Sequence, residues 1–230
     1  MRTGPASVLA PAHHAVAAIH APSAHRLGIA TTLPRAAAAG AVTITFDDGP
    51  HPEGTPQILA LLAAHQVRAT FFVVGEQVQR RPELVRRIVQ EGHLVALHAH
   101  RHQLQLRRSA RDLSDDYTRG MAAIEEAINR TPTLHRPPYG IYSRAGLHQA
   151  RQRGLQPLLW SAWGKDWRKF TTPERIAARV IGDLHPRGTI VLLHDADFYS
   201  ARHSHLRTAQ ALKHILTHLE SSKTGTVLPV

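Results

Sequence analysis

Short apolar runs alternate with longer amphipathic segments from residue 41 to the end of the chain. The short runs are rich in β-branched residues or leucine and are bounded by polar or turn-forming residues, which is typical of strands. They cover residues 41–46, 69–74, 93–97, 133–136, 157–162 and 189–193, with a further short candidate at 226–230. Most of the intervening segments have helical spacing, and Thr55 ahead of Pro56 is expected to cap the first helix.

Strands that alternate with helices along a chain form parallel βαβ units. About seven strands fall short of the eight that close a complete barrel. The pattern therefore predicts an α/β fold, a distorted or incomplete (β/α) barrel of about seven parallel strands.

The alternation begins near residue 41, so we expect two regions of unequal character. Residues 41–230 form the predicted catalytic domain, and residues 1–40 form an N-terminal extension that is either helical or partly ordered. The extension is rich in Ala, His and Pro. Pro11, His13 and His14 interrupt the apolar segment that a signal peptide needs, and no run of about 18 apolar residues would span a membrane.

The net charge of +11 raises the question of a nucleic-acid partner. The 28 basic residues comprise 24 arginines and four lysines, scattered along the chain without an aromatic RNA-binding motif or a basic recognition helix. We therefore expect no nucleic-acid partner. An anionic envelope polymer and a simple compositional bias both stay compatible with the charge. Cysteine is absent, so histidine and carboxylate groups are the only strong metal ligands.

Polar residues gather where the predicted strands end. Asp47 and Asp48 follow the first strand, His98 and His102 follow the third, and Arg136 begins a polar turn after the fourth. His194 and Asp195 follow the strand at 189–193. Because the carboxyl ends of parallel strands lie on one face of such folds, we expect these side chains to share one pocket.

The types of residue at these strand ends suit a divalent metal. An Asp-Asp-Gly-Pro stretch is by itself more often a turn, and a histidine in a chain with 18 of them is often solvated. The four-residue spacing of His98 and His102, however, places both imidazoles on one side of a helical turn. With Asp48, they offer three ligands and leave positions open for water and substrate, as in catalytic zinc sites.

Five short motifs follow one another along the chain. They are Thr45-Phe46-Asp47-Asp48-Gly49-Pro50; Gly92-His93 leading to His98-Ala99-His100-Arg101-His102; Arg136-Pro137-Pro138-Tyr139-Gly140; Asp166-Trp167; and Leu192-Leu193-His194-Asp195. Together they span about two thirds of the chain, and in this order they resemble the polysaccharide deacetylases of the nodulation-protein (NodB) type, carbohydrate esterase family 4. The resemblance implies an enzyme that removes N-acetyl groups from polysaccharides that contain N-acetylglucosamine.

The resemblance also implies a role for each matching residue. Asp48, His98 and His102 would bind one divalent metal ion, zinc in the first place, with cobalt or nickel as alternatives. Asp47 would be the general base, held by Arg136, and His194 the general acid, oriented by Asp166. The backbone N–H of Tyr139, in the turn that contains Pro138, would stabilise the oxyanion. Trp167 and Leu192 would line the pocket for the acetyl group.

One position departs from the family pattern. Ala99 stands where the family usually has Thr or Ser, so a hydroxyl beside the metal ligands is lost, and such losses can change metal affinity. His100 lies between the two histidine ligands, and we expect it to point away from the metal because two residues along a helical turn leave the ligand face.

The motifs leave the polymer open. Peptidoglycan and chitin-type oligomers rank first as partners, and a monomer is expected. The alternatives are a deformylase or deacetylase of a lipid-linked amino sugar and a catalytically silent sugar-binding protein. Similar bacterial proteins act in the cell envelope or outside the cell, but no signal peptide is visible, so a cytoplasmic location stays open as well.

Overall fold

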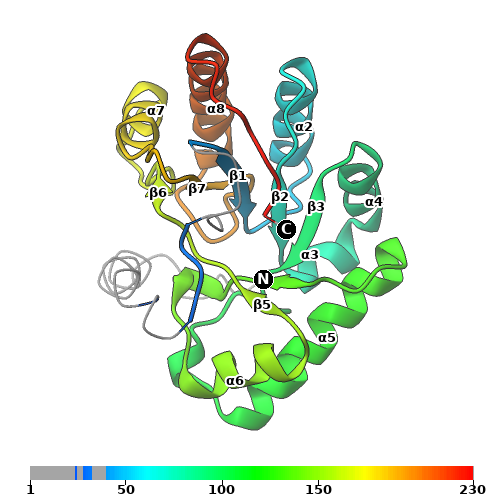
Figure 1. Cartoon of the computed structure of the whole chain (residues 1–230). Helices are drawn as coiled ribbons and strands as arrows, with labels where there is room; N and C mark the ends of the chain where they lie inside the picture. The colour runs from blue at the N-terminus through cyan, green and yellow to red at the C-terminus, as the bar shows by residue number, and fades with distance from the viewer. Residues whose placement is uncertain (1–23, 25–27, 33–39, 230) are drawn as a thin grey trace.

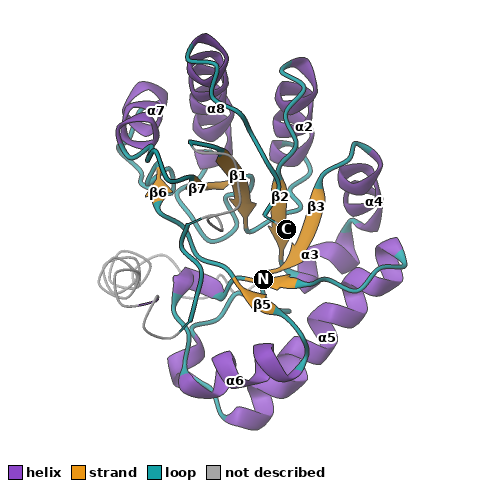
Figure 2. Ribbon diagram, viewed as in Figure 1, coloured by secondary structure: helices purple, strands orange, loops and turns teal. Residues whose placement is uncertain are grey.

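The computed structural model describes residues 24, 28–32 and 40–229. Helices surround a curved parallel sheet (Figure 1), and the chain alternates between the two kinds of element (Figure 2). The strands are β1 (Val42–Asp47), β2 (Thr70–Val73), β3 (Leu94–Leu97), β4 (Leu134–His135), β5 (Gln156–Pro157), β6 (Ala162–Trp163) and β7 (Thr189–His194). The α-helices are α2 (Gly54–Ala64), α3 (Gly75–Arg80), α4 (Pro82–Gln90), α5 (Ala110–Ile128), α6 (Arg144–Gln152), α7 (Pro173–Gly182) and α8 (Ser204–Ser221), and the 3₁₀ turns are η2 (Gln105–Arg107) and η3 (Pro138–Gly140).

Among the described residues, the seven strands form one sheet in the order β5-β4-β3-β2-β1-β7-β6, and every pairing is parallel. The sheet curls into a half-barrel, which confirms the predicted α/β fold. β1 lies between β2 and β7, and all residues of β1 and β7 are buried. Their pairing sets Asp47 directly beside His194.

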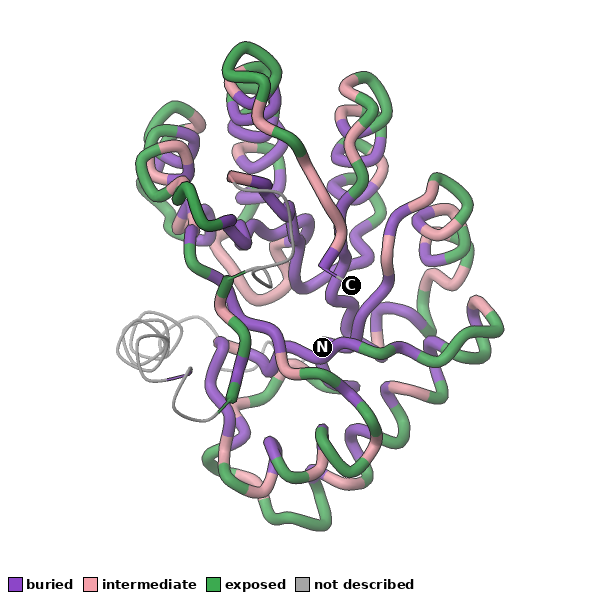
Figure 3. Tube along the Cα trace, viewed as in Figure 1, coloured by how far each residue is buried: buried purple, intermediate pink, exposed green. Residues whose placement is uncertain are grey.

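The core lies between the strands and the inner sides of the helices, while exposed residues lie on the outer sides (Figure 3). Phe46 of β1 stacks on Phe71 of β2 with ring centroids 5.1 Å apart. Leu59 of α2 and Leu212 of α8 are fully buried in the same cluster. Because burying such a side chain contributes about 1.5–3 kcal/mol, this packing fixes the helices against the strands that carry the site.

The strand predicted at residues 157–162 is wrong as a single element. Its start belongs to β5, which pairs with β4, and its end belongs to β6, which pairs with β7 at the opposite edge of the sheet. Residues 158–161 therefore cross from one edge to the other. No neighbouring strand takes all of their backbone groups, so the crossing depends on other partners.

Arg136, which follows β4, supplies two of those partners. Its Nε donates to the carbonyl oxygen of Leu158 at 3.1 Å, and its Nη2 donates to that of Leu159 at 2.9 Å. The guanidinium is fully buried, and its Nη1 donates to Asp47 Oδ1 at 2.7 Å. One side chain thus ties the crossing segment to the end of β1.

Replacing Arg136 by Met is expected to lower the free energy of unfolding by about 3–5 kcal/mol, because Asp47 would be left as a buried carboxylate without its partner. Urea denaturation of the metal-free protein measures this change. Arg144→Met, at an exposed position of α6, is the control and should stay within about 0.5 kcal/mol of the parent. Equal stability of the two variants would contradict the role given to Arg136.

Two smaller expectations also fail. Residues 226–229 form no strand: Thr226 makes a single parallel bridge with Val42, and Val227 N–H donates to the Val42 carbonyl. Thr55 does not cap α2, which begins at Gly54. The Thr55 hydroxyl instead donates to Asp195, while His51 Nδ1 accepts from the N–H groups of Glu53 and Gly54. The side chain of His51, which precedes the helix, therefore caps its start in place of Thr55.

The predicted extension at residues 1–40 lies mostly outside the described residues, so its character stays a prediction. Of its described part, Ile29 is buried, and the Ala30 carbonyl accepts from Leu159 N–H in the crossing segment. In the described part of the chain, no helix is long and apolar enough to cross a membrane.

Candidate active site

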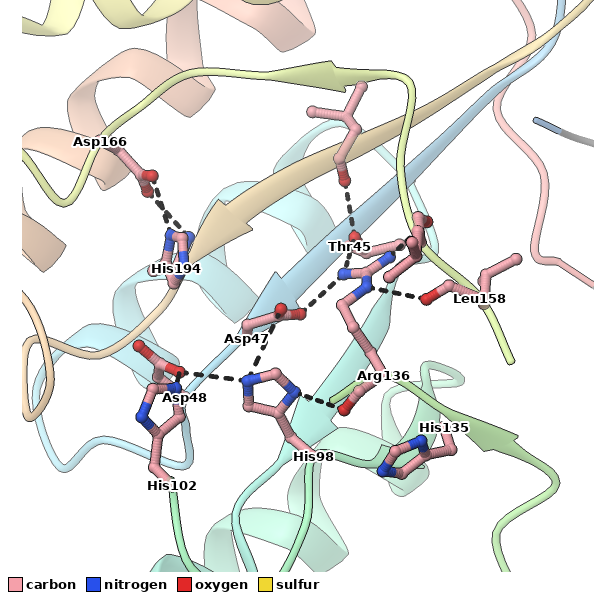
Figure 4. Close-up of polar contacts among 12 residues, drawn as sticks. Thr45, Asp47, Asp48, His98, His102, His135, Arg136, Leu158, Asp166 and His194 are labelled. Carbon is pink, nitrogen blue, oxygen red and sulfur yellow. Dashed lines mark hydrogen bonds and ion pairs between the residues drawn. The ribbon is translucent and has the colours of Figure 1, made fainter. Parts of the chain in front are cut away.

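Asp47 and Asp48 lie where β1 ends and face different partners (Figure 4). Asp48 has φ of 80°, a left-handed conformation that aspartate tolerates better than most residues, and it turns its carboxylate away from that of Asp47. Both side chains are buried. The two consecutive carboxylates are therefore separated by the backbone and are free to act differently.

His98 and His102 converge on Asp48. Their Nε2 atoms lie 3.5 and 3.2 Å from Asp48 Oδ1, which agrees with the predicted cluster. The helical turn expected between them is wrong, because both residues lie in an irregular loop after β3 in which Ala99 has φ of 69°. The left-handed bend at Ala99 brings the two imidazoles together, as four-residue spacing would on a helix.

The hydrogen bonding of His98 indicates that a cation fits this cluster. His98 Nδ1 is 2.8 Å from the Arg136 carbonyl oxygen and, in the neutral ring, donates its hydrogen there. The lone pair of Nε2 then faces the Asp48 carboxylate, so two acceptors point into the same space. A divalent cation satisfies both, and a backbone carbonyl that accepts from the other ring nitrogen is the usual support of a metal-binding histidine.

The charge of Asp48 depends on its neighbours. Burial by itself would raise the pKa of Asp48, but hydrogen bonds and positive charge from the histidines around it, His102 first, outweigh burial and hold that pKa well below the usual range, and a cation between these groups would act in the same direction. Burial lowers the pKa of His102 and thus favours its neutral ring. An ionised carboxylate and a neutral imidazole are the forms in which these groups bind metals.

Arg136 holds Asp47 from the side away from the cluster. Besides the contact with Asp47 Oδ1, its Nη1 donates to the Thr45 hydroxyl at 2.8 Å, and its guanidinium lies 4.0 Å from the centre of the Phe72 ring. The other oxygen, Asp47 Oδ2, is 3.8 Å from His98 Nε2. One oxygen of Asp47 is therefore anchored and the other faces the predicted metal ligands.

His194 and Asp166 form a buried pair across the pocket from His98 (Figure 4). Asp166 Oδ1 is 2.9 Å from His194 Nδ1, and Asp166 Oδ2 accepts from His194 N–H and from the Thr208 hydroxyl. Burial would lower the pKa of His194, but the Asp166 carboxylate outweighs it and raises that pKa to about 10. Asp166 thus holds a protonated imidazole with Nε2 left for other partners.

A pocket connects these groups. Its lining includes five of the predicted polar residues, three further motif residues (Tyr139, Gly140 and Leu192) and three residues that the motifs did not identify. The full lining is Asp47, Asp48, His98, His102, Tyr139, Gly140, Trp160, Leu192, His194, Tyr199 and Ser200. Arg136 and Asp166 lie behind Asp47 and His194. Trp167 contacts His194 edge-on, with ring centroids 5.7 Å apart, and neither it nor Pro138 is part of the lining.

Local reasons explain the places of Gly140 and of the three wall residues outside the motifs. Gly140 has φ of 69°, and a Cβ there would lie 2.2 Å from the Trp160 ring, so the turn after Arg136 requires glycine for that ring to fit. Trp160 belongs to the crossing segment, which the sequence presented as an ordinary strand. Tyr199 and Ser200 lie in the loop that follows β7. Their position after the last strand could have identified them from the sequence, because loops at the carboxyl ends of parallel strands build the active site.

His100 and Asp195 are buried near the cluster but are engaged elsewhere. His100 is buried and packs against Gly75, where a Cβ would lie 2.5 Å from His100 Nδ1, so it points away from Asp48 as expected. Asp195 is buried beneath Gly49, and burial raises its pKa to about 7. It accepts from Thr55 and thereby ties the start of α2 to the turn after Asp48.

A second group, His51, Asp197 and His205, also brings possible ligand atoms together. His51 Nδ1 accepts from two backbone N–H groups, so its Nε2 carries the hydrogen of the neutral ring and faces Asp197 Oδ1 at 3.4 Å as a donor. Burial lowers the pKa of His51, which favours that neutral form. His51 therefore has no lone pair for a metal while it accepts these two N–H groups.

Comparison with known proteins identifies the family. The model of the polysaccharide deacetylase family matches residues 35–158, more than half of the chain. A chitooligosaccharide deacetylase of Bradyrhizobium sp. is 41% identical over 155 residues, 67% of this chain and 70% of that protein. A peptidoglycan-N-acetylglucosamine deacetylase of Bacillus cereus is 38% identical over 181 residues, 78% of this chain and 81% of that protein.

A solved structure gives the same relationship. The crystal structure of a peptidoglycan N-acetylglucosamine deacetylase superposes with a TM-score of 0.81 at 28% identity, over 89% of this chain and 92% of that one. That protein was crystallised in complex with an N-hydroxybenzamide compound. On the family match, the identities and the shared fold, the chain belongs to the polysaccharide deacetylases, carbohydrate esterase family 4.

Proposed function

We propose that this protein is a metal-dependent hydrolase that removes N-acetyl groups from polysaccharide containing N-acetylglucosamine, either peptidoglycan or chitin-type oligomers. The observation that carries the proposal is the convergence of Asp47 and His194 on the pocket that holds Asp48, His98 and His102. A base and an acid on opposite sides of a three-ligand cluster are the parts that hydrolysis of an amide needs.

Asp48, His98 and His102 are the proposed ligands of one divalent ion, with zinc first and cobalt or nickel as alternatives. When bound, such an ion polarises an amide carbonyl and lowers the pKa of water. Tyr139 and Leu192 line the same pocket as the three proposed ligands, which supports placing the acetyl group beside them. We assign the backbone N–H of Tyr139 to the oxyanion and the side chains of Leu192 and Trp167 to the acetyl methyl.

Asp47 is the proposed general base. Arg136 fixes its Oδ1 and leaves Oδ2 to accept a proton from water as the water oxygen bonds to the acetyl carbon. The buried guanidinium also neutralises the carboxylate charge, so the base stays in place without solvent.

His194 is the proposed general acid. Its Nδ1 is engaged by Asp166, so Nε2 is the atom that donates a proton to the sugar nitrogen as the carbon–nitrogen bond breaks. The products are acetate and a free amino sugar. The raised pKa of His194 keeps the acid protonated at neutral pH until the leaving nitrogen takes the proton.

Replacing Asp166 by Asn is expected to bring the pKa of His194 down from about 10 to roughly 6.5 or lower. The raised pKa means that this pair stabilises the fold below pH 6.5 and loses that contribution as the pH rises toward about 10. Proton NMR of the metal-free protein follows the ring of His194 directly. A wild-type ring that titrates near pH 6.5 would remove the basis for its role as the acid.

Acetate release tests the function itself. Metal-stripped protein is incubated with N-acetylglucosamine oligomers and with peptidoglycan, with and without added Zn²⁺ or Co²⁺, and acetate and bound metal are measured together. We expect release that depends on metal, from at least one of the two polymers. Protein that binds metal but releases no acetate from either would point to a lipid-linked amino sugar or to a silent sugar-binding role.

A further inference from the structure

The two histidines of the metal cluster are held in different ways. His98 is fixed by the hydrogen bond from its Nδ1 to the Arg136 carbonyl. The corresponding atom of His102, also Nδ1, is buried and has no hydrogen-bond partner among the described residues. Metal-binding histidines almost always donate this second N–H to a partner that fixes the ring. His102 therefore needs another source of orientation.

Two aromatic rings enclose the imidazole of His102. The Tyr199 ring stacks on it nearly in parallel, with an interplanar angle of 9° and centroids 4.1 Å apart. The Tyr139 ring meets it edge-on, at 67° and 4.7 Å. A parallel contact of this kind restricts the tilt of the imidazole, and the edge contact restricts its sliding.

Tyr199 is itself held from several sides. Its hydroxyl accepts from Gln77 Nε2 at 3.3 Å. Its loop is tied down on the far side by the Ala201 N–H, which donates to the Trp167 carbonyl, and by the His203 N–H, which donates to Asp197. The Tyr199 ring is therefore a fixed surface for His102 rather than a freely rotating side chain.

We propose that Tyr199 is a positioning residue for the metal ligand His102, and that ring stacking replaces the hydrogen bond that His102 lacks. The inference rests on the proposed function, because it takes His102 to be a ligand. Stacked aromatic pairs contribute about 0.5–1.5 kcal/mol, which corresponds to about 2- to 13-fold in affinity. The effect falls on the metal affinity of the free protein, before any sugar is bound.

Tyr199→Leu and Tyr199→Phe separate the ring from the hydroxyl. Metal-stripped proteins are titrated with Zn²⁺ against a chelator of known affinity and with Co²⁺ by visible absorption, without substrate. We expect Tyr199→Leu to bind Zn²⁺ about 3- to 10-fold more weakly and to change the Co²⁺ spectrum. Tyr199→Phe keeps the ring and should stay within about 2-fold of wild type.

Phe198→Leu is the matched control, because Phe198 stands next to Tyr199 in the same loop and its ring packs on His51. It should leave zinc affinity unchanged. Wild-type affinity in Tyr199→Leu, or an equal loss in Phe198→Leu, would overturn the proposal. If the wild-type protein itself binds no metal through His98, the proposed function fails instead, so the two failures are distinguishable. Circular dichroism establishes that each variant is folded.

Discussion

Replacing His98 by Ala is expected to abolish tight metal binding and, with it, metal-dependent acetate release. The substitution removes one of three proposed protein ligands and also frees the Arg136 carbonyl that now fixes the ring. Loss of an outer hydrogen-bond partner alone weakens metal sites 10–100-fold, so loss of the ligand should weaken this one by more than about 100-fold. Elemental analysis and chelator competition measure the change.

His205→Ala is the control for that experiment, because His205 belongs to the second histidine group and its partner His51 has no lone pair to offer a metal. It should keep one metal ion per chain with unchanged affinity. Full zinc occupancy in His98→Ala together with loss in His205→Ala would mean that the second group is the metal site.

Asp47→Asn should lower the rate of acetate release by at least about 100-fold while metal stays bound. The amide keeps the size of the carboxylate but cannot accept a proton from water, and general-base catalysis contributes about 10²–10⁴-fold. Turnover with saturating metal and bound metal per chain are measured on the same preparation.

The second measurement decides how a loss of activity is interpreted. Asp47 Oδ2 lies 3.8 Å from His98 Nε2, so the carboxylate is close to the proposed ligands without being one of the three. If Asp47→Asn lost its metal, the role of Asp47 would be to support metal binding and not to act as the base. If it turned over at the wild-type rate, another group would be the base.

Much of the fold could be predicted because strand and helix patterns are local. β1 and β7 lie within the sheet with every residue buried, so each appears in the sequence as a run of apolar residues and threonine that ends at a polar residue. β5 and β6 could not be told apart, because the two-residue strands are joined by apolar residues that look like more strand. Their separation depends on Arg136, which captures the backbone of the crossing segment.

The candidate site divides in a similar way. The motif residues could be identified because acids and histidines at strand ends meet on one face in parallel folds. Tyr199 and Trp160 were not identified as pocket residues from the sequence, because an aromatic residue in a loop or an apolar run looks the same whether it packs in the core or lines a pocket. The irregular loop at residues 98–102 could not be predicted either, since four-residue spacing of two histidines suits both a helix and a bent loop.

The sequence by itself determined the alternation of strands and helices, the family and the set of side chains able to do the chemistry, because these depend on residue type and short-range order. Only the tertiary structure decided which nitrogen of each histidine is free. His98 and the Arg136 carbonyl are 38 residues apart in the chain, whereas His51 takes its hydrogen bonds from Glu53 and Gly54 at the start of α2. For His98, folding supplies a carbonyl to one side of the ring and leaves the lone pair of the other nitrogen for a metal, and no local pattern in the sequence carries that information.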